Sequence, residues 1–362
     1  MVLPRIPYTA PFPPPTLYPA HATSLPAAIA VLHAFLSHPS HRKTALISGA
    51  GISVASGLRD YRGTSGTYRL NQHYRPIFFH EFASQHASRQ RYWARSFVGW
   101  PATAAARPNA AHRAVYQLRA HGALCGVVTQ NVDSLHGVDG GVLELHGFLR
   151  AVACLACKTA IKRDVWQAEL ERLNPLWAGI LQDGGGEKLR MNADGDVDLP
   201  SADYTQFRYP PCPVCLAEDR GRTVRVDQDG GMEAGGDGVK AVVKPCVTFF
   251  GESVDPEVKV AAERLVEEAD AVLVVGSSLA TYSAWRLVRD AERAGKGVAV
   301  VNIGGVRGED AFFGQKRAAG ERVRLEVDAA GVLAGVVEAF GGKSEPAKEQ
   351  PYLAASWTGV GG

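Results

Sequence analysis

Short apolar runs bounded by glycine or polar residues recur along the chain and alternate with segments of helical periodicity. Four of these runs predict buried strands, at 44–47, 126–129, 271–275 and 297–301. The segments around them predict helices at 27–36, 78–99, 108–121, 256–269 and 282–295. Strands that are apolar on both faces and are followed by helices favour an α/β fold with a doubly wound parallel sheet.

A stretch from about 150 to 245 interrupts this alternation. Within it, the segments 184–195 and 227–238 are rich in glycine and aspartate and predict flexible surface insertions without regular structure. The start of the chain is rich in proline and predicts an extended arm. We therefore predict an arm at 1–24, a sheet domain made of 25–149 and 246–340, an inserted module at 150–245 and a tail at 341–362.

Four of the six cysteines form two Cys-x-x-Cys pairs, Cys154 with Cys157 and Cys212 with Cys215. Each pair places two thiolates on a tight turn, so two pairs can complete a tetrahedral site with Zn–S distances of about 2.3 Å. Disulfides or redox pairs are the alternative, although a secreted disulfide framework would have denser cysteine. The spacing favours one structural zinc ion. Cys125 lies in an apolar run and is expected in the core.

The composition limits the classes of partner. With 362 residues, of which 46% are hydrophobic and 21% charged, the chain can form about two domains with sizeable cores. The formal net charge of +2 gives no reason to expect direct nucleic-acid binding or an anionic membrane surface. No apolar run approaches the roughly 20 residues of a transmembrane helix, so no membrane partner is predicted.

Three of the predicted strands end in a glycine or polar turn, at 49–51, 276–278 and 302–304. In a doubly wound sheet, ligands bind at the carboxyl ends of the strands, where backbone N–H groups can face phosphate. Three such turns predict a nucleotide site, and loop glycines chosen only for turn geometry are the alternative. The usual Gly-x-Gly-x-x-Gly pattern is absent, because Gly51 is followed by Ile52, Ser53 and Val54. A standard dehydrogenase is therefore not favoured.

Polar residues follow the strand at 126–129. Gln130, Asn131 and Asp133 can hold a ribose and a carboxamide by hydrogen bonds. His146 lies just ahead of the first cysteine pair, and its imidazole could act as a base near neutral pH. His136 is a weaker candidate for the same role. A structural role is the alternative for both histidines.

These motifs, in their order along the chain, resemble those of the sirtuin family. The resemblance rests on the two cysteine pairs and on the segments 49–62, 129–136, 145–147, 249–252, 276–279 and 302–304, and it covers about 25–340. It implies a Rossmann-like NAD-binding domain that carries a small inserted zinc-binding module. It also implies a substrate that passes through a cleft between the two.

The implied activity is that of an NAD-dependent protein-lysine deacylase. Such an enzyme transfers the acyl group of a modified lysine to ADP-ribose and releases nicotinamide, and its partners are acyl-lysine proteins or peptides. The resemblance implies His146 as the base and Asn131 as a second catalytic residue.

The resemblance also assigns the binding residues. For NAD they are Gly49, Ala50, Gly51, Ile52, Ser53, Asp60, Tyr61, Arg62, Gln130, Asn131, Asp133, Gly276, Ser277, Ser278, Asn302, Ile303, Gly304 and Val323. For the substrate peptide, which would add a strand, they are Thr248, Phe249, Phe250, Gly251 and Glu252.

The segment 89–101 further resembles the class II mitochondrial branch of the family, which predicts a location in the mitochondrial matrix. Within it, Tyr92 and Arg95 are three residues apart on a predicted helix and face one side. A hydroxyl beside a guanidinium suits a carboxylate at the end of an acyl chain, so longer or acidic acyl groups are predicted substrates. A buried tyrosine beside a solvated basic face is the alternative.

Two other functions remain open. A mono-ADP-ribosyltransferase would use the same NAD site, and a non-catalytic NAD- and zinc-binding module would keep the same motifs. Three departures from the family pattern bear on the site: Arg59 in place of proline, and Cys246 and Thr248 in place of the usual Asp and Val.

Overall fold

The computed structural model describes residues 9–71, 74–182, 190–199, 202–219, 223–235, 239–314 and 320–342. These residues form two compact units. The sheet unit consists of described residues within 9–74, 106–146 and 254–342, and the cysteine unit of those within 75–105 and 147–253.

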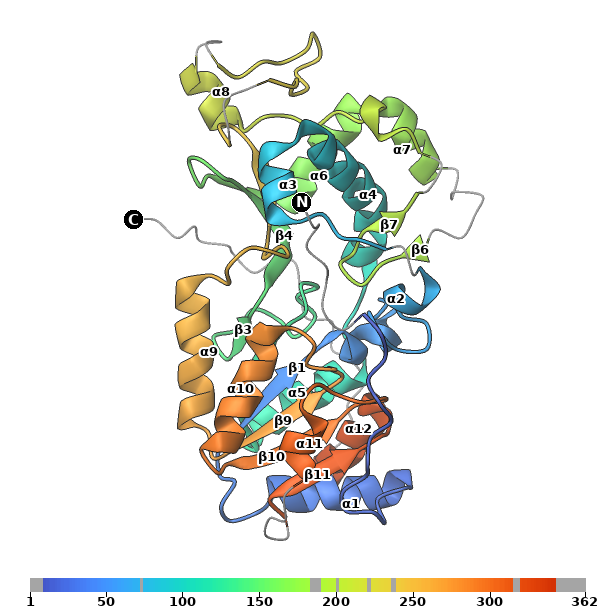
Figure 1. Ribbon diagram of the computed structural model, residues 1–362, viewed down its shortest axis with the longest axis vertical. Coiled ribbons are helices and arrows are strands. Elements are labelled where there is room, and N and C mark those ends of the chain that lie inside the picture. Colours follow the sequence, from blue (N-terminus) through green and yellow to red (C-terminus); the bar gives the residue numbers. More distant parts are fainter. Residues whose placement is uncertain are drawn as a thin grey trace. The chain divides into compact units, whose positions relative to one another are not determined.

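The sheet unit is built on six parallel strands in the order β11-β10-β9-β1-β2-β3 (Figure 1). Their bounds are β1 Thr44–Ser48, β2 Leu124–Thr129, β3 Val142–Glu144, β9 Ala271–Val275, β10 Gly297–Val301 and β11 Arg322–Leu325. Every residue of β1, β9 and β10 is buried, as the continuous apolar runs predict.

Helices cover both faces of this sheet. Leu46 and Leu273 pack with α1 (Leu25–Leu36), α5 (Ala110–Ala120) and α12 (Ala329–Ala339). Alternate residues such as Ile47 and Val274 pack with α9 (Pro256–Glu268), α10 (Tyr282–Arg293) and α11 (Glu309–Phe313). The predicted α/β class with a doubly wound parallel sheet is therefore confirmed. A 3-10 helix, η1 (Ala50–Ser56), follows β1, and a short helix, α2 (Thr67–Leu70), lies farther along.

The cysteine unit contains an antiparallel sheet in the order β5-β4-β8. Its strands are β4 Gly147–Cys154, β5 Ala160–Lys162, β8 Val243–Val247 and the short pair β6 Arg190–Met191 and β7 Val197–Asp198. Its helices are α3 Phe79–Ser84, α4 His86–Ala105, α6 Arg163–Leu173, α7 Pro175–Gln182, η2 Tyr204–Gln206 and α8 Pro213–Asp219.

This unit is larger than the 150–245 module that the sequence predicts. It also takes in 75–105, because Trp93 and Phe97 of α4 pack in one core with Trp166 of α6 and with Phe207. The single helix expected at 78–99 is divided into α3 and α4 by Gln85, whose backbone is extended.

The described part of the first glycine-rich segment carries regular structure, whereas that of the second, residues 227–235, consists of turns and bends with one isolated bridge, as predicted. Residues 190–198 carry β6 and β7, and Asp196 and Val197 are buried, because Asp196 forms an ion pair with Arg95 of α4. In the second segment, Met232 is buried and bridges to Val226. Residues 184–189 and 236–238 of these segments, 1–8 of the arm and 343–362 of the tail lie outside the described residues.

Among the helices that the structure describes, none combines the length and the apolar character needed to cross a membrane.

Candidate functional site

Two glycine turns meet at the carboxyl ends of β1 and β9. The Gly51 N–H donates to the Gly276 carbonyl at 2.8 Å. A Cβ on Gly49 would lie 2.7 Å from the Ser277 Cβ, and one on Gly276, whose φ is +60°, would lie 2.4 Å from the Ile52 nitrogen. The glycines are therefore required by the close contact between the turns, in which the N–H groups of Gly49, Gly51 and Gly276 donate to the carbonyls of Val275, Gly276 and Val301. This contact brings the two turns together at the predicted nucleotide site.

Gln130 connects this pair of turns to the end of β2. Its side-chain amide donates to the Ser48 carbonyl at 3.0 Å and to the Ser277 hydroxyl at 2.7 Å. Its side-chain carbonyl accepts from the Thr281 hydroxyl at 3.2 Å. The structure therefore brings the turns of β1, β2 and β9 into one hydrogen-bonded group.

Asn131 and Asp133 share Ser53 as a partner. The Asn131 amide donates to the Ser53 hydroxyl at 3.1 Å and to the Gly49 carbonyl at 3.2 Å. The Ser53 hydroxyl donates to the Asp133 carboxylate at 2.6 Å. Burial raises the pKa of Asp133, while hydrogen bonds from Leu135 and Ser53 act to lower it. Asn131 and Asp133 thus lie against Ser53 in the first turns of η1.

His146 follows β3 and the buried Leu145 in the sheet unit. Its Nδ1 lies 3.1 Å from the Gln130 carbonyl, and its Nε2 lies 2.8 Å from the Ser283 hydroxyl. Because a carbonyl can only accept, Nδ1 carries the proton and Nε2 keeps its lone pair. Burial lowers the pKa of His146 to about 4, although the bond to Gln130 acts to raise it. The imidazole is therefore neutral near pH 7 and presents a basic nitrogen.

His136 lies within a second polar group of the same unit. Its Nε2 is 2.8 Å from the Ser48 hydroxyl, which donates to the Thr129 hydroxyl at 2.9 Å. Its ring packs against that of His112 at a centroid distance of 4.8 Å. Burial lowers the pKa of His136 to about 4 and lowers that of His112 well below its usual value. His136 therefore has a structural role beneath the turns.

The residues after η1 fold into a compact loop. The Asp60 carboxylate accepts from the Gly63 N–H at 2.9 Å, and Thr67 and Tyr68 donate to the main chain of Asp60 and Tyr61. Arg62 stacks on the Tyr68 ring at 5.1 Å. Burial raises the pKa of Asp60 and lowers that of Arg62. Three predicted cofactor residues are thus held in a loop that is closed by its own hydrogen bonds.

The third predicted turn follows β10. Ile303 is 62% exposed, and Asn302 donates from its side chain to the carbonyls of Ile303 and Gly304. Val323 lies within β11 and is buried in the core against α1 and α12. Ser278 accepts from the Arg307 N–H through its carbonyl.

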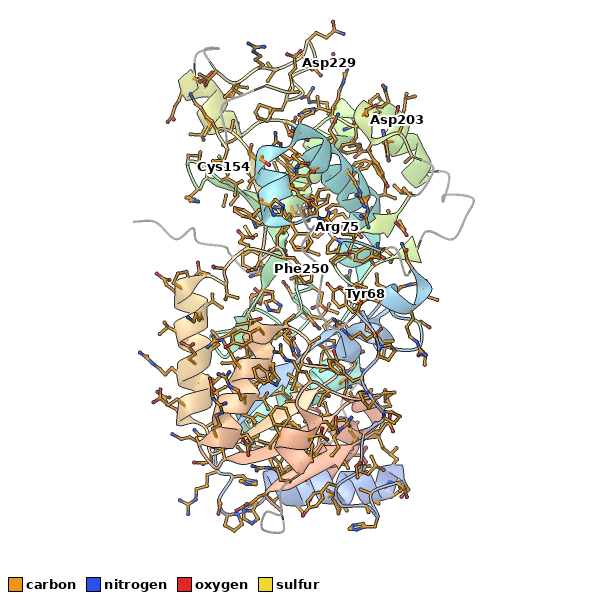
Figure 2. The ribbon with its side chains drawn as sticks, viewed as in Figure 1. Tyr68, Arg75, Cys154, Asp203, Asp229 and Phe250 are labelled. Carbon is orange, nitrogen blue, oxygen red and sulfur yellow. The ribbon has the colours of Figure 1, made fainter. Side chains whose placement is uncertain are left out.

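The four paired cysteines come together in the cysteine unit, as predicted. Their sulfur atoms all lie within 4.8 Å of one another, and the cross-pair distances Cys154–Cys215 and Cys157–Cys212 are 3.6 Å. A tetrahedral zinc ion with Zn–S distances of about 2.3 Å requires sulfurs roughly 3.8 Å apart, so the donor set and its spacing fit one structural zinc. Figure 2 labels Cys154 on β4.

In the cysteine unit, Arg95 is buried and Tyr92 is partly buried. The Arg95 guanidinium forms an ion pair with Asp196 at 2.9 Å, and its Nε donates to the Val197 carbonyl at 2.9 Å. The Tyr92 ring packs on Phe249 at 5.1 Å, and burial raises the pKa of its phenol. Burial, followed by the neighbouring Asp194, raises the pKa of Asp196 well above its usual value. A solvated basic face is therefore excluded at Arg95, and its charge already has a partner in the chain.

The segment 248–252 follows β8. The Phe249 N–H donates to the Glu252 carboxylate at 2.8 Å, and the Phe250 carbonyl accepts from the Phe79 N–H at 2.9 Å. Gly251 has a φ of +81°, which closes this turn. A peptide added as a strand would have to use other main-chain groups, such as those of Thr248. Burial raises the pKa of the nearby Cys246 thiol to about 11, which disfavours the reactive thiolate form of that residue.

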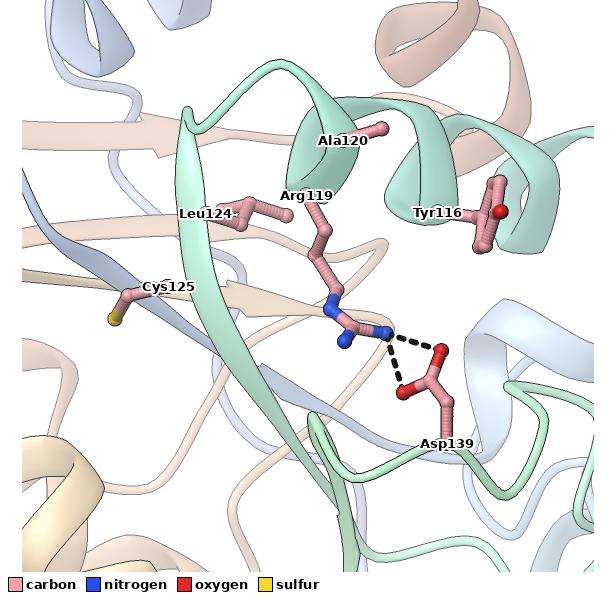
Figure 3. Close-up of a pocket in the computed structure, with 6 residues that line it drawn as sticks. All are labelled: Tyr116, Arg119, Ala120, Leu124, Cys125 and Asp139. Atoms are coloured by element: carbon pink, nitrogen blue, oxygen red, sulfur yellow. Dashed lines mark hydrogen bonds and ion pairs between the residues drawn. The ribbon is translucent and has the colours of Figure 1, made fainter.

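A pocket of about 270 Å³ lies elsewhere on the sheet unit (Figure 3). Its lining residues are Tyr116, Arg119, Ala120, Leu124, Cys125 and Asp139. Arg119 and Asp139 form an ion pair at 2.9 Å, so the polar groups already satisfy each other. Cys125 is exposed here, which makes the prediction of a core position wrong. It is the one exposed residue of β2, and it lies before Val127, where the pairing with β3 begins.

Sequence reasoning missed Ser283, Thr281 and the role of Ser53. Ser283 lies 137 residues from His146, so no local pattern connects them. Asp196 was missed because its partner Arg95 lies 101 residues away in the sequence.

Comparisons with known proteins agree with this geometry. The Sir2 family model matches residues 49–283. An "NAD-dependent protein deacylase SIR4" of Batrachochytrium dendrobatidis is 38% identical over 280 residues, 75% of this chain and 84% of the relative. An "NAD-dependent protein deacetylase" of Bordetella bronchiseptica is 43% identical over 267 residues, 73% of this chain and 85% of the relative.

Solved structures share the fold. One described as "Structural Basis for the Mechanism and Regulation of Sir2 Enzymes" is 25% identical, with a TM-score of 0.53 over 86% of this chain and 96% of its own. One described as "Structure of Sir2Tm bound to a propionylated peptide" is 22% identical, with a TM-score of 0.56 over 86% and 98%.

The cysteine cluster predicts one equivalent of zinc. Cys157→Ser should lose the metal, measured by mass spectrometry, and lower the Tm by about 10 °C, because a site lacking one thiolate no longer stabilises the unit. Cys246→Ser is the matched control and should keep both metal and Tm. Full zinc content in the Cys157 variant would contradict the site.

The buried histidines predict sensitivity to acid. Each has a folded-state pKa below the unfolded value of 6.5, so the unfolded chain binds more protons as the pH falls from about 6.5 toward 4. The free energy of unfolding should therefore fall over this range, by about 1.4 kcal/mol per pH unit for each histidine. Urea unfolding followed by circular dichroism should show a smaller pH slope in His136→Gln. Equal slopes in variant and parent would contradict the assignment.

Proposed function

The chain belongs to the Sir2 family, and on this premise we propose that it is an NAD-dependent protein-lysine deacylase. Two relatives that carry the names of NAD-dependent deacylases or deacetylases are 38% and 43% identical to it over most of their own length. The residues at the carboxyl ends of β1, β2, β9 and β10 are those that would hold NAD. When bound, NAD supplies the ADP-ribosyl group that accepts the acyl group as nicotinamide leaves.

The observation that supports catalysis most directly is the state of His146. Its Nδ1–H is fixed by the Gln130 carbonyl, and its Nε2 accepts a hydrogen bond from the Ser283 hydroxyl. A base must be unprotonated to act, and the lowered pKa keeps this imidazole neutral at physiological pH. A substrate hydroxyl that replaces Ser283 as the donor would find the lone pair already oriented. The Gln130 carbonyl would then stabilise the imidazolium that forms.

The NAD-side residues fit a dinucleotide on structural grounds. Gly49, Gly51 and Gly276 add no side chain to these turns, so a phosphate group could approach the backbone closely. The Gln130 and Asn131 amides are held by fixed partners, so they can orient ribose and carboxamide groups with little loss of side-chain entropy. The four cysteines would hold zinc with no open position, so the metal would have a structural role.

We propose acyl-lysine peptides as the substrates. Support comes from the family, and from a relative of known structure that is described as bound to a propionylated peptide. Mono-ADP-ribosyl transfer from the same NAD site and a non-catalytic binding module remain the alternatives, but no observation favours either. For location, we propose the mitochondrial matrix, and the support is the resemblance of segment 89–101 to the class II mitochondrial branch.

The assignment of the base is testable. His146→Asn keeps a donor for the Gln130 carbonyl but removes the basic nitrogen, so O-acyl-ADP-ribose formation should fall by a factor of about 10² to 10⁴. The rate is measured by mass spectrometry with an acyl-lysine peptide and NAD, and NAD binding by calorimetry. His80→Asn, an exposed position on α3, is the control. Unchanged product formation in His146→Asn would refute the role, and ¹⁴C label from adenine-labelled NAD that stays on protein would favour transfer.

We also propose that Tyr92 and Arg95 select the acyl group, with Asp196 holding the guanidinium until an acyl carboxylate replaces it. Asp196→Asn removes the competing charge, so kcat/KM for a glutaryl peptide relative to an acetyl peptide should rise, by about tenfold for one charge-assisted hydrogen bond gained. A panel of acetyl, glutaryl, methylglutaryl and lipoyl peptides measures this ratio. Asp203→Asn, at an exposed position, is the control. An unchanged ratio in Asp196→Asn would contradict the selector.

A further inference from the structure

The turn after β10 has a defined shape although it lies at the surface. The Asn302 side chain donates to the carbonyls of Ile303 and Gly304 at 3.1 and 3.0 Å, and Gly304 has a φ of +83°. The Asn302 N–H donates to the Leu325 carbonyl at 3.1 Å, which continues the pairing of β10 with β11. The turn thus stands at the carboxyl end of a parallel strand, where a nucleotide is bound in this class of sheet.

Arg324 braces this turn from the neighbouring strand. Its side chain is fully buried, at 0% exposure. Its two terminal nitrogens donate to the carbonyls of Asn302 at 3.0 Å and of Gly304 at 2.6 Å. The guanidinium is planar and rigid, so it fixes the separation of these two carbonyls. The first and third residues of the turn are therefore held by one side chain.

Two carboxylates complete the brace. Glu309 accepts from the Arg324 Nε at 2.6 Å and, with its other oxygen, from the Val306 N–H at 2.9 Å. Glu326 accepts from the Gly304 N–H at 2.9 Å. Both the N–H and the carbonyl of Gly304 are therefore bound, and the turn has little freedom to change its backbone angles.

The N-terminal arm lies against the same structure. Tyr18 exchanges two main-chain hydrogen bonds with Arg324, at 3.1 and 2.7 Å. A Cβ on Gly305 would lie 2.1 Å from the Pro13 carbonyl oxygen, so the residue that follows the turn is glycine because the arm passes close to it. The arm thus abuts the strand and the turn that Arg324 connects.

We propose that Arg324 is a positioning residue for NAD, which holds the Asn302–Gly304 turn in the shape that binds the adenosine half of the dinucleotide. The inference rests on the proposed NAD-dependent function. Without the guanidinium, the Asn302 and Gly304 carbonyls and the Glu309 carboxylate would face one another in a buried space, and the turn would have to move. His146 and Gln130 lie at other strand ends, so the chemistry would be unaffected once NAD is bound.

Arg322 offers a matched comparison. It lies two residues earlier on β11, so its side chain projects from the same face, and it is 2% exposed. It donates to the carbonyls of Phe312 and Lys296, and Lys296 lies just before β10. Arg322 therefore braces the amino end of that strand, while Arg324 braces the carboxyl end.

The test replaces each arginine by lysine, which keeps the charge and removes the fork. Arg324→Lys should raise both KM and calorimetric Kd for NAD about tenfold, the effect of one charge-assisted hydrogen bond. Its kcat at saturating NAD and its KM for the peptide should stay within about twofold. Arg322→Lys should lower the Tm about as much as Arg324→Lys does. Its Kd for NAD should nevertheless stay within about twofold of the parent value.

Equal changes of Kd in the two variants, or an unchanged Kd in Arg324→Lys, would overturn the proposal. Glu326→Ala is a second variant for the case that Arg324→Lys does not fold, because Glu326 is exposed. It frees the Gly304 N–H and should raise Kd for NAD about threefold, the lower end for one hydrogen bond, and no rise would count against the proposal. A parent protein that binds NAD but does not deacylate peptides would refute the proposed function and leave this inference standing.

Discussion

The contact between the Gly51 N–H and the Gly276 carbonyl is the constraint on which the rest of the sheet unit's site depends. It holds the ends of the neighbouring strands β1 and β9 so close together that a Cβ atom on Gly51 or Gly276 would clash with the facing turn. Ser277 and Gln130 reach each other only because these turns are in contact, and the Gln130 main chain in turn fixes the tautomer of His146. The steric requirement at the two turns thus bears on which nitrogen of His146, the proposed base, carries the proton.

The chemistry of this unit depends on neutral groups held by single, directed hydrogen bonds. His146, His136 and His112 are all kept uncharged by burial, and each faces a hydroxyl, a carbonyl or another ring. A neutral, preorganised environment suits a reaction in which positive charge develops on the sugar and must be stabilised without water. The near-neutral charge of the whole chain is consistent with this, because NAD would be held locally by backbone and amide groups.

The features that could be predicted from the sequence are those that depend on residues close together in the chain. Continuous apolar runs locate β1, β9 and β10, and Cys-x-x-Cys spacing locates the metal site, because both depend on neighbours in the chain. The strand β11 was missed because Arg322 and Arg324 interrupt its apolar pattern. These side chains are buried because carbonyl and carboxylate groups of other segments accept their hydrogen bonds. Ser283 and Asp196 could not be found for the same reason. The membership of α4 in the cysteine unit depends on aromatic packing between segments more than 70 residues apart, as between Trp93 and Trp166.

The pairing of Tyr18 with Arg324 has a consequence for the solution behaviour of the chain. A parallel sheet that ended at β11 would present a row of unpaired N–H and carbonyl groups, and such an edge can recruit a strand from another molecule. The arm occupies part of that edge, and its many prolines cannot donate to a further strand. The arm that the sequence predicts as extended therefore leaves fewer main-chain groups of this edge open to pairing with another molecule.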